Sequence, residues 1–460
     1  MGVSNEIFRA YDIRGIVDES LSCEIVYKIG QAFGTKVRQA SHNITKVIIG
    51  RDGRLSGPKL ANSLAKGIQA TGCDVISVGA VATPLLYYAS KKLNIPSAVM
   101  LTGSHNPSNY NGLKMILEDK AIYGEQIQEI KNIINSQEFL NGDASYSEYN
   151  IEPEYMQEIT HKINTPKPLK IVIDAGNGIP GAIAPQLFKN LGHEVIALFC
   201  EVDGNFPNHH PDPGDPNNLK DLIQSVIKNN ADIGLAFDGD GDRLGIIDSN
   251  GKIIWPDRSL MAFAQDVLKE KNNSTIIYDI KSTNNLDSII KAAGGKPLMY
   301  KTGHSLIKAK MRETGAALAG EMSGHVFFAH NWYGFDDALY AGAKILEIIA
   351  KTNESSATFF AKFPENVSTP ELPIDVTEDE KFGIIKKLQE IAHFPGAKNI
   401  STIDGLRVDF DDRWGLIRCS NTSPKLISRF EGLSNESLKS IQDSFKQLLL
   451  QVAPHLKTPF

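Results

Sequence analysis

The sequence has few cysteines, no long apolar run and no excess of basic charge, and each absence excludes a class of protein. Four cysteines in 460 residues form no C-x-x-C pair, which argues against a disulfide scaffold or a zinc site. No stretch approaches the roughly 18 consecutive apolar residues that a membrane helix needs. The 48 basic and 54 acidic side chains give a net charge of −6, which disfavours a nucleic-acid-binding protein.

Two further absences narrow the location and the chemistry. Residues Met1–Glu6 lack the apolar core of a signal peptide, so we expect a cytoplasmic protein. There is no G-x-x-x-x-G-K-[ST] motif, so a P-loop nucleoside triphosphatase is disfavoured. We expect a small-molecule ligand, with no nucleic acid, no membrane and no obligate protein partner. The 42% hydrophobic and 22% charged composition is typical of a large folded protein with several domains.

Short β-branched runs alternate with helix-length amphipathic stretches through the first three quarters of the chain. These runs are Thr45–Gly50, Asp74–Val78, Ser97–Leu101, Leu169–Ile173, Glu194–Phe199, Ile233–Phe237 and Thr275–Tyr278. The alternation predicts βαβ units with mostly parallel sheets. The C-terminal region has closely spaced strand-like runs at Asn399–Ile403, Leu406–Phe410, Gly415–Cys419 and Lys425–Phe430, then an amphipathic helix over Asn435–Leu450. That pattern predicts an antiparallel α+β domain.

Three features indicate domain boundaries. Prolines cluster at Pro364–Pro373, directly before the antiparallel pattern. The polar stretch Asn141–Asn150 is typical of a linker, and the turn Asp248–Gly251 is either a hairpin or a hinge.

The segment Asp238–Arg243 (DGDGDR) follows the apolar run Ile233–Phe237 and is the strongest functional signal. Three carboxylates at alternate positions, separated by glycines, can converge on one hard cation. An acidic surface turn is the simpler alternative. A calcium EF-hand loop does not fit, because its invariant glycine would be Arg243. The position after a buried strand favours a metal site, with Mg²⁺ as the ion.

The segment Leu101–Pro107 (LTGSHNP) also follows an apolar strand. A serine between Gly103 and His105 at the carboxyl end of a strand is placed as a nucleophile often is. The motif is not the G-x-S-x-G of lipases, and an ordinary turn of the same composition is the alternative. A serine near a three-carboxylate metal site would indicate phosphoryl transfer, with Lys114 supplying charge nearby.

Two more polar segments are candidates for ligand binding. Gly320–His325 (GEMSGH) combines a carboxylate, a hydroxyl and an imidazole that could bind sugar hydroxyls, or its glutamate could be a satisfied core residue. Lys301–His304, just upstream, opens a helical stretch whose amides could hold an anion. Arg418–Pro424 (RCSNTSP) could cradle a phosphate, or it could be a polar hairpin loop.

One motif favours a different function. Gly176–Gly181 forms a G-x-G-x-x-G pattern after a strand, and Glu201 or Asp203 lies where a ribose-binding acid is found. This pattern favours an NAD(P)-dependent oxidoreductase. Pro180 at the start of the helix argues against it, and tight packing between a strand and a helix needs the same glycines.

Taken in order, these motifs resemble the α-D-phosphohexomutase superfamily, and most closely its bacterial phosphomannomutase/phosphoglucomutase group. The resemblance begins at Ala10–Gly15 and covers the full chain. It implies three similar mixed α/β domains and a C-terminal α+β domain around a central active-site cleft. With the boundaries above, the domains are residues 1–148 with the phosphoserine loop, 149–250 with the metal loop, 251–366 with the sugar-binding loop and 367–460 with the phosphate-binding loop.

The resemblance also implies a role for each motif. Ser104 would carry the phosphoryl group, and Asp238, Asp240 and Asp242 would hold Mg²⁺ together with the Ser104 phosphate. The other implied catalytic residues are His105, Lys114, Arg14 and Arg243, and the choice of general base stays open. The implied substrate-binding residues are Tyr11, Lys281, His304, Glu321, Met322, Ser323, Gly324, His325, Arg418, Cys419, Ser420, Asn421 and Thr422.

The implied reaction interconverts the 1-phosphate and the 6-phosphate of mannose, glucose or both. It proceeds through a phosphoserine enzyme and a hexose 1,6-bisphosphate, which also serves as activator. Met322 favours the mannose/glucose enzymes, because phosphoglucosamine mutases tend to have glutamine at this position. Phosphoglucosamine mutase is the alternative within the superfamily.

Overall fold

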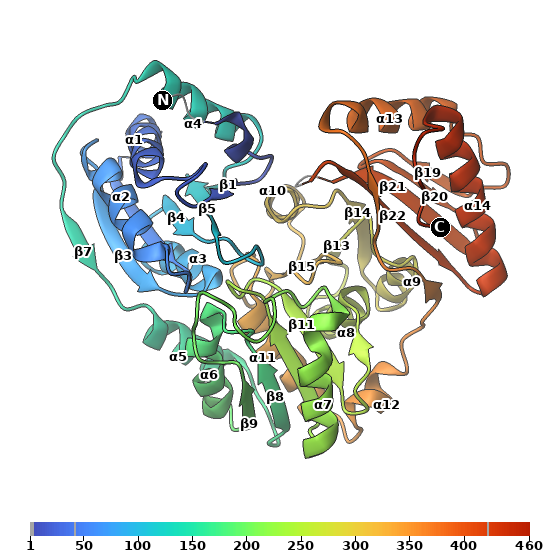
Figure 1. Ribbon diagram of the computed structural model, residues 1–460. Helices are drawn as coiled ribbons and strands as arrows, with labels where there is room; N and C mark the ends of the chain where they lie inside the picture. Colours follow the sequence, from blue (N-terminus) through green and yellow to red (C-terminus); the bar gives the residue numbers. More distant parts are fainter. Residues whose placement is uncertain (1–3, 41–42, 421–422) are drawn as a thin grey trace.

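Four successive regions of the chain each build one β-sheet, and Figure 1 shows them running from the upper left, through the bottom, to the upper right. The computed structural model describes residues 4–40, 43–420 and 423–460. In that part of the chain, no helix is long and apolar enough to cross a membrane.

The first sheet has the strand order β1-β5-β4-β2-β3-β7, and β6 pairs with β5. Its strands are β1 (Ile13–Ile16), β2 (Lys46–Arg51), β3 (Asp74–Ala80), β4 (Ala98–Leu101), β5 (Tyr110–Leu117), β6 (Lys120–Ala121) and β7 (Tyr146–Glu148). Its helices are η1 (Asn5–Ile7), α1 (Cys23–Gln39), α2 (Gly57–Gln69), α3 (Thr83–Lys92) and α4 (Glu125–Ser136). Successive side chains of β2 alternate between two cores, with Val47 and Ile49 in one and Ile48 in the other, so helices cover both faces of the sheet.

The predicted linker at residues 141–150 contains a strand. Tyr146–Glu148 form β7, which pairs in parallel with β3 at the edge of the first sheet. All three residues of β7 are exposed, so the segment has no alternation of buried and exposed positions. That exposure explains why its sequence is typical of a linker.

The second sheet has the order β12-β11-β10-β8-β9. Its strands are β8 (Lys170–Asp174), β9 (Glu194–Leu198), β10 (Ile233–Phe237), β11 (Leu244–Asp248) and β12 (Ile253–Ile254). Its helices are α5 (Glu152–Lys162), η2 (Ile179–Ala182), α6 (Ala184–Asn190), η3 (Pro216–Leu219) and α7 (Lys220–Asn229). β10 runs parallel to β8 and forms an antiparallel hairpin with β11. Because β12 pairs with β11, the second sheet continues beyond residue 250.

The third sheet has the order β14-β13-β15-β16. Its strands are β13 (Thr275–Asp279), β14 (Lys296–Tyr300), β15 (Leu318–Gly320) and β16 (Val326–Phe328). Its helices are α8 (Pro256–Glu270), α9 (Asn285–Ala292), α10 (His304–Thr314), α11 (Ala338–Ala350) and α12 (Ser356–Phe360). Every residue of α11 is buried, and one apolar cluster joins the first three units through residues such as Met100, Leu235 and Leu346. The three units therefore share a core.

The fourth sheet is antiparallel, with the order β17-β22-β21-β20-β19 and with β18 also paired to β22. Its elements are β17 (Val367–Ser368), β18 (Leu372–Asp375), α13 (Glu378–Ile391), β19 (Asn399–Ser401), β20 (Leu406–Asp409), β21 (Arg413–Cys419), β22 (Lys425–Gly432) and α14 (Asn435–Val452). The α+β pattern is confirmed, but α13 was not predicted. Its start carries a sequence signal, the capping box between Thr377 and Glu380.

A buried histidine in the second unit makes stability depend on pH. His193 is 5% exposed, and its Nδ1 accepts a hydrogen bond from the Leu169 amide at 3.2 Å. Burial lowers the pKa of His193 from 6.5 to about 4. Unfolding therefore takes up a proton between these values, so this contribution to stability is complete above pH 6.5 and is lost as the pH falls toward 4.

We expect His193→Asn, whose amide oxygen can replace Nδ1 as acceptor, to flatten the loss of stability in acid. The pKa shift of His193 corresponds to a loss of up to about 3 kcal/mol in the free energy of unfolding, at 1.36 kcal/mol for each pKa unit. The measurement is Tm between pH 7 and pH 4.5 for both proteins. The wild type should lose more Tm than the variant, and parallel curves would contradict the assignment.

Candidate active site

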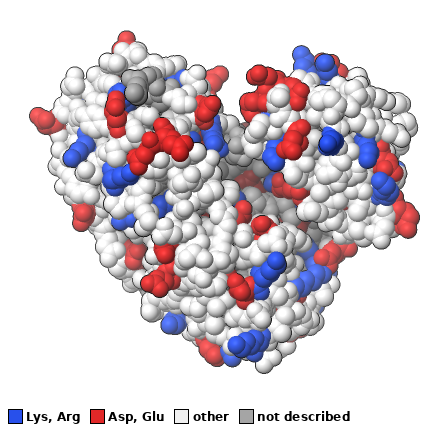
Figure 2. Space-filling view, viewed as in Figure 1, with Lys and Arg blue, Asp and Glu red and all other residues white. Residues whose placement is uncertain are grey.

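A central cleft of about 870 Å³ collects most of the predicted site residues from all four units. Figure 2 shows the molecule hollowed between its two upper lobes. The predicted residues that line the cleft are Tyr11, Arg14, Ser104, His105, Lys114, Arg243, Lys281, His304, Glu321, Met322, Ser323, His325, Arg418 and Ser420. One cavity thus brings together motifs that lie hundreds of residues apart in the sequence.

Of the remaining predicted residues, Gly324 does not line the cleft, although its neighbours Ser323 and His325 do. Asp238, Asp240 and Asp242 are fully buried next to Ser104 and Lys114. The side chain of Cys419 does not line the cleft: it packs against the core of the fourth unit, and its Sγ contacts the Lys381 carbonyl. Asn421 and Thr422 lie outside the described residues.

Ser104 sits on the loop between β4 and β5 and points toward the metal loop. It is 2% exposed, and its Oγ donates a hydrogen bond to Asp238 Oδ2 at 2.9 Å. His105 Nδ1 lies 3.2 Å from the same Oγ. Burial, reinforced by the nearby Arg243, lowers the pKa of His105 well below its usual value. A neutral imidazole therefore lies beside the serine hydroxyl.

The loop between β10 and β11 folds around Asp238. Its Oδ1 accepts hydrogen bonds from the amides of Gly241, Asp242 and Arg243 at 3.0–3.1 Å. Gly241 has φ +76°, a left-handed conformation that glycine adopts without strain. This turn brings ligand oxygens of Asp238, Asp240 and Asp242 within 4.8 Å of one another.

The residues of this loop fit a metal ion. Three buried carboxylates and the Ser104 hydroxyl form an all-oxygen donor set, which hard divalent cations prefer. Among the described residues, Asp240 Oδ1 is buried and has no hydrogen-bond partner. Burial and the two neighbouring aspartates raise the pKa of Asp238 well above its usual value. A bound cation would favour the charged form and complete these interactions.

Lys114, on β5, neutralises part of the same cluster. Its Nζ lies 2.7 Å from Asp240 Oδ2 and 2.5 Å from Asp242 Oδ2. Burial opposes the charge on Lys114, but these two aspartates outweigh it and hold its pKa well above the usual value. Lys114 is therefore a fixed cation that links the first unit to the metal loop of the second.

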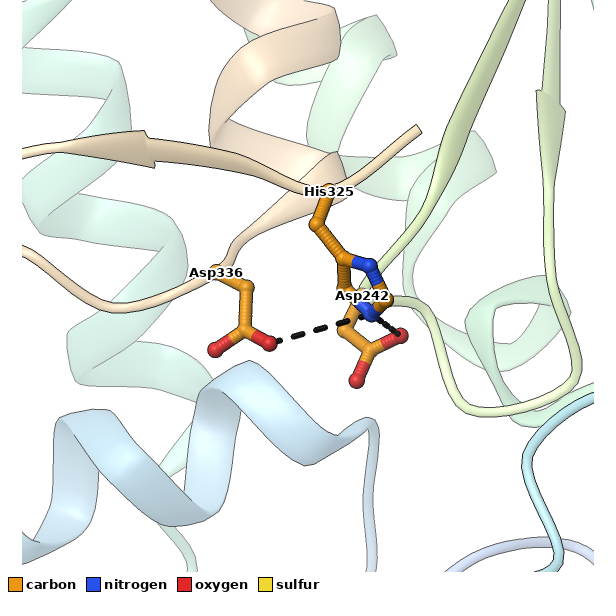
Figure 3. Close-up of side chains that lie close together, drawn as sticks. All are labelled: Asp242, His325 and Asp336. Atoms are coloured by element: carbon orange, nitrogen blue, oxygen red, sulfur yellow. Dashed lines mark ion pairs between the residues drawn. The ribbon is translucent and has the colours of Figure 1, made fainter. Parts of the chain in front are cut away.

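The predicted sugar-binding loop joins the metal loop directly. Figure 3 shows His325 between Asp242 and Asp336, with Nε2 at 3.1 Å from Asp242 Oδ1 and 3.9 Å from Asp336 Oδ2. The Leu244 amide also donates to the Gly324 carbonyl at 3.1 Å. Burial opposes protonation, but Asp242 and Glu321 raise the pKa of His325 to about 9. Because Lys308 also pairs with Asp336, this cluster is a network of ion pairs.

On the opposite wall, two cations from the third and fourth units are paired with carboxylates. Arg418 Nε lies 3.0 Å from Asp404, and Lys281 Nζ lies 2.5 Å from Glu371. The Tyr11 hydroxyl donates to the Thr302 carbonyl at 3.2 Å, which connects the first unit to this wall. An anionic ligand would find two preformed cationic groups here.

Several residues that build the site were not predicted from the sequence. Thr83, at the start of α3, donates to Asp240 Oδ2 at 2.6 Å across 157 residues of sequence. Lys308 and Asp336 support His325, and Asp404 and Glu371 pair with the cations. Thr83 and Lys308 lie in ordinary helical sequence and carry no signal. Among these residues, the acidic pair Asp336-Asp337 shortly after Gly334 is the one feature that stands out in the sequence.

The glycines of Gly176–Gly181 serve packing. A Cβ on Gly178 would lie 2.9 Å from Gly239 of the metal loop, and one on Gly181 would lie 2.3 Å from the Cys200 carbonyl oxygen. Neighbouring chain therefore occupies the space at these glycines. The nearby Asp174 contacts a histidine: its Oδ2 lies 3.0 Å from His209 Nε2.

A serine hydroxyl hydrogen-bonded to one carboxylate of a buried triad, with fixed cations on both sides of one cleft, is the arrangement expected of an enzyme of phosphoryl transfer. Family models describe the same four units: phosphoglucomutase/phosphomannomutase alpha/beta/alpha domain I matches residues 5–141, domain II 153–251, domain III 255–367 and the C-terminal domain 371–448. The chain belongs to the phosphoglucomutase/phosphomannomutase family, in the α-D-phosphohexomutase superfamily.

Full-length relatives agree with this assignment. A phosphomannomutase/phosphoglucomutase of Pseudomonas putida is 51% identical over 99% of this chain and 98% of its own. A phosphoglucomutase of Neisseria gonorrhoeae is 48% identical over 99% of both. A solved family protein of Burkholderia thailandensis has a TM-score of 0.95 at 48% identity, with complete coverage of both chains. The phosphohexomutase interpretation therefore holds over the oxidoreductase alternative.

Proposed function

We propose that this phosphohexomutase interconverts the 1-phosphates and 6-phosphates of mannose and glucose through a phosphoserine at Ser104. The observation that carries the proposal is the hydrogen bond of Ser104 to Asp238 at 2.9 Å, at the wall of a cleft that also holds Arg418 and Lys281. One cleft can then hold both ends of a hexose 1,6-bisphosphate, the intermediate and activator in this proposal.

The metal of the proposal is Mg²⁺, held by Asp238, Asp240, Asp242 and the Ser104 phosphate. When bound, it would neutralise the oxygens of the transferred phosphoryl group. Lys114 and Arg243 add fixed positive charge from two sides, since Lys114 pairs with Asp240 and Arg243 lies 4.0 Å from Asp238. The chain thereby stabilises a charge that develops in the transition state.

The distal phosphate is assigned to Arg418, Ser420 and Lys281. In this structure Asp404 and Glu371 take the positions opposite the two cations. When a phosphate binds, each cation would exchange its carboxylate partner for the phosphate. This exchange limits the cost of desolvating the cations. Glu321 and His325 also line the cleft and are assigned to the sugar hydroxyls.

The choice of sugars rests on similarity. The Pseudomonas putida relative is named for both mannose and glucose phosphates, and the Neisseria gonorrhoeae relative for glucose phosphate. Met322 lines the cleft, and we assign this side chain to the sugar. Glucosamine phosphate is the alternative substrate. Besides the metal ion, we propose hexose phosphates as the ligands, with no nucleic acid, membrane or obligate protein partner.

A substrate panel tests the proposal. Purified protein with Mg²⁺ and a trace of glucose 1,6-bisphosphate is incubated with mannose, glucose or glucosamine 1-phosphate, and ³¹P NMR follows the 6-phosphates. We expect turnover of mannose and glucose phosphates and at least about tenfold slower turnover of glucosamine phosphate. A preference for glucosamine phosphate would support the alternative, and no turnover of any substrate would refute the proposal.

A further inference from the structure

Arg54, on the loop that follows β2, lies behind the Ser104 loop and outside the cleft lining. It is 1% exposed, and all five of its N–H donors have acceptors. The acceptors are the Asp52 carboxylate at 3.1 Å and the carbonyl oxygens of Ser104 at 2.8 Å, Asn106 at 2.6 Å, Pro107 at 2.5 Å and Tyr110 at 3.0 Å. One guanidinium thus holds three carbonyls of the Ser104 loop and that of Tyr110, the first residue of β5.

Asp52 holds the other end of the same loop. Its Oδ2 accepts hydrogen bonds from Thr102 Oγ1 at 2.8 Å and from the Gly103 amide at 3.2 Å. Thr102 Oγ1 in turn accepts a hydrogen bond from the Ser104 amide at 2.7 Å. The buried Asp52–Arg54 pair therefore fixes the backbone on both sides of the serine.

The loop needs such support because its backbone is strained. Ser104 has φ +49°, a left-handed conformation that costs a non-glycine residue of order 1 kcal/mol or more. Gly103 packs against Arg54 so closely that a Cβ there would lie 2.4 Å from Cζ. The Phe206 ring, from the second unit, lies 5.1 Å from the guanidinium. Arg54 is thereby confined by the first and second units.

We propose that Arg54 is a positioning residue for phosphoryl transfer, which holds Ser104 in the strained conformation that directs its Oγ toward Asp238. The inference rests on the proposed function of Ser104. Transfer depends on in-line geometry, and a displacement of about 1 Å can reduce its rate by about 10²-fold. Lysine cannot replace this arginine, because its ammonium has three donors at one point, whereas the guanidinium is a planar fork.

The test compares Arg54→Lys with Arg38→Lys. Arg38 also binds backbone carbonyls of the first unit, those of Thr71 at 2.9 Å and Asn141 at 3.2 Å, away from the cleft. For Arg54→Lys we expect kcat to fall about 10²-fold with KM changed less than about threefold. Intact-mass analysis should show phosphate uptake from glucose 1,6-bisphosphate slowed by a similar factor. Hydrogen exchange should accelerate in residues 103–110. Arg38→Lys should change Tm alone.

A second variant approaches the same contact from the loop. Gly103→Ala places a methyl group against the guanidinium and should produce the same fall in kcat. The kcat of the double variant should fall by less than the product of the two single fold-changes, because both substitutions disrupt the same contact between residues 54 and 103. If Arg54→Lys does not fold, Gly103→Ala carries the test.

The outcomes separate the two proposals. If the wild type carries no phosphate after incubation with glucose 1,6-bisphosphate, the function proposed for Ser104 fails. If the wild type takes up phosphate and the folded variants match its kcat and uptake rate, the positioning role of Arg54 fails. A lower Tm with an unchanged kcat would likewise show that the role of Arg54 is structural.

Discussion

Ser104→Ala should lower turnover of glucose 1-phosphate by at least about 10⁴-fold, because it removes the atom proposed to accept and return the phosphoryl group. The fold should survive, since the lost hydroxyl contacts Asp238 Oδ2 and His105 Nδ1 and alanine fits the space. The measurement is the coupled mutase assay, together with intact mass after incubation with glucose 1,6-bisphosphate. The variant should gain no phosphate.

Ser97→Ala provides a matched control. Ser97 is fully buried directly before β4, and within the described residues its hydroxyl has no hydrogen-bond partner. This variant should keep its activity and its phosphate uptake. If Ser104→Ala retained wild-type turnover, the phosphoserine mechanism would be excluded at this position.

Asp240→Asn should reduce turnover at saturating hexose phosphate by about 10³-fold and weaken activation by Mg²⁺. The amide removes one negative charge from the triad, while Lys114 and Thr83 keep their places around the side chain. Activity is measured against Mg²⁺ concentration after treatment with EDTA. For the wild type, EDTA should abolish activity and added Mg²⁺ should restore it.

Asp248→Asn controls for the chemical change. Asp248 ends β11 on the same hairpin, is 3% exposed, and accepts hydrogen bonds from the amides of Asn250 and Lys252. We expect a small loss of Tm and an unchanged Mg²⁺ dependence. Equal Mg²⁺ curves for Asp240→Asn and the wild type would contradict the assignment of the metal site.

The sequence predicted the strands better than the connections between them. Apolar runs such as Ile233–Phe237 form buried strands, as predicted, because a strand covered on both faces needs continuous apolar sequence. β5 was not predicted, because Asn111, Gly112 and Lys114 interrupt its apolar pattern. Lys114 serves the site, whereas Asn111 binds the Ser56 hydroxyl and Gly112 packs against the Ile13 carbonyl. A functional requirement and close packing together obscure the structural signal.

The site was predictable where a motif directly follows a strand. Ser104 and Asp238 both lie at the ends of buried strands, which brings them to the edge of their sheets. Thr83, Asp336 and Arg54 act through partners that only the tertiary structure brings near. Arg54 carries a faint signal, since Asp52 and Arg54 follow the buried β2, but a charged turn has the same composition.

The core shared by the first three units has a consequence for how the chain can be divided. Helix α11 is buried over its whole length, and the apolar cluster that contains it extends into the first and second sheets. A fragment that ends after the second sheet would leave that surface uncovered in water. The three units share a common architecture, but because they share this core we expect them to unfold as a single cooperative body and not as a row of independent modules.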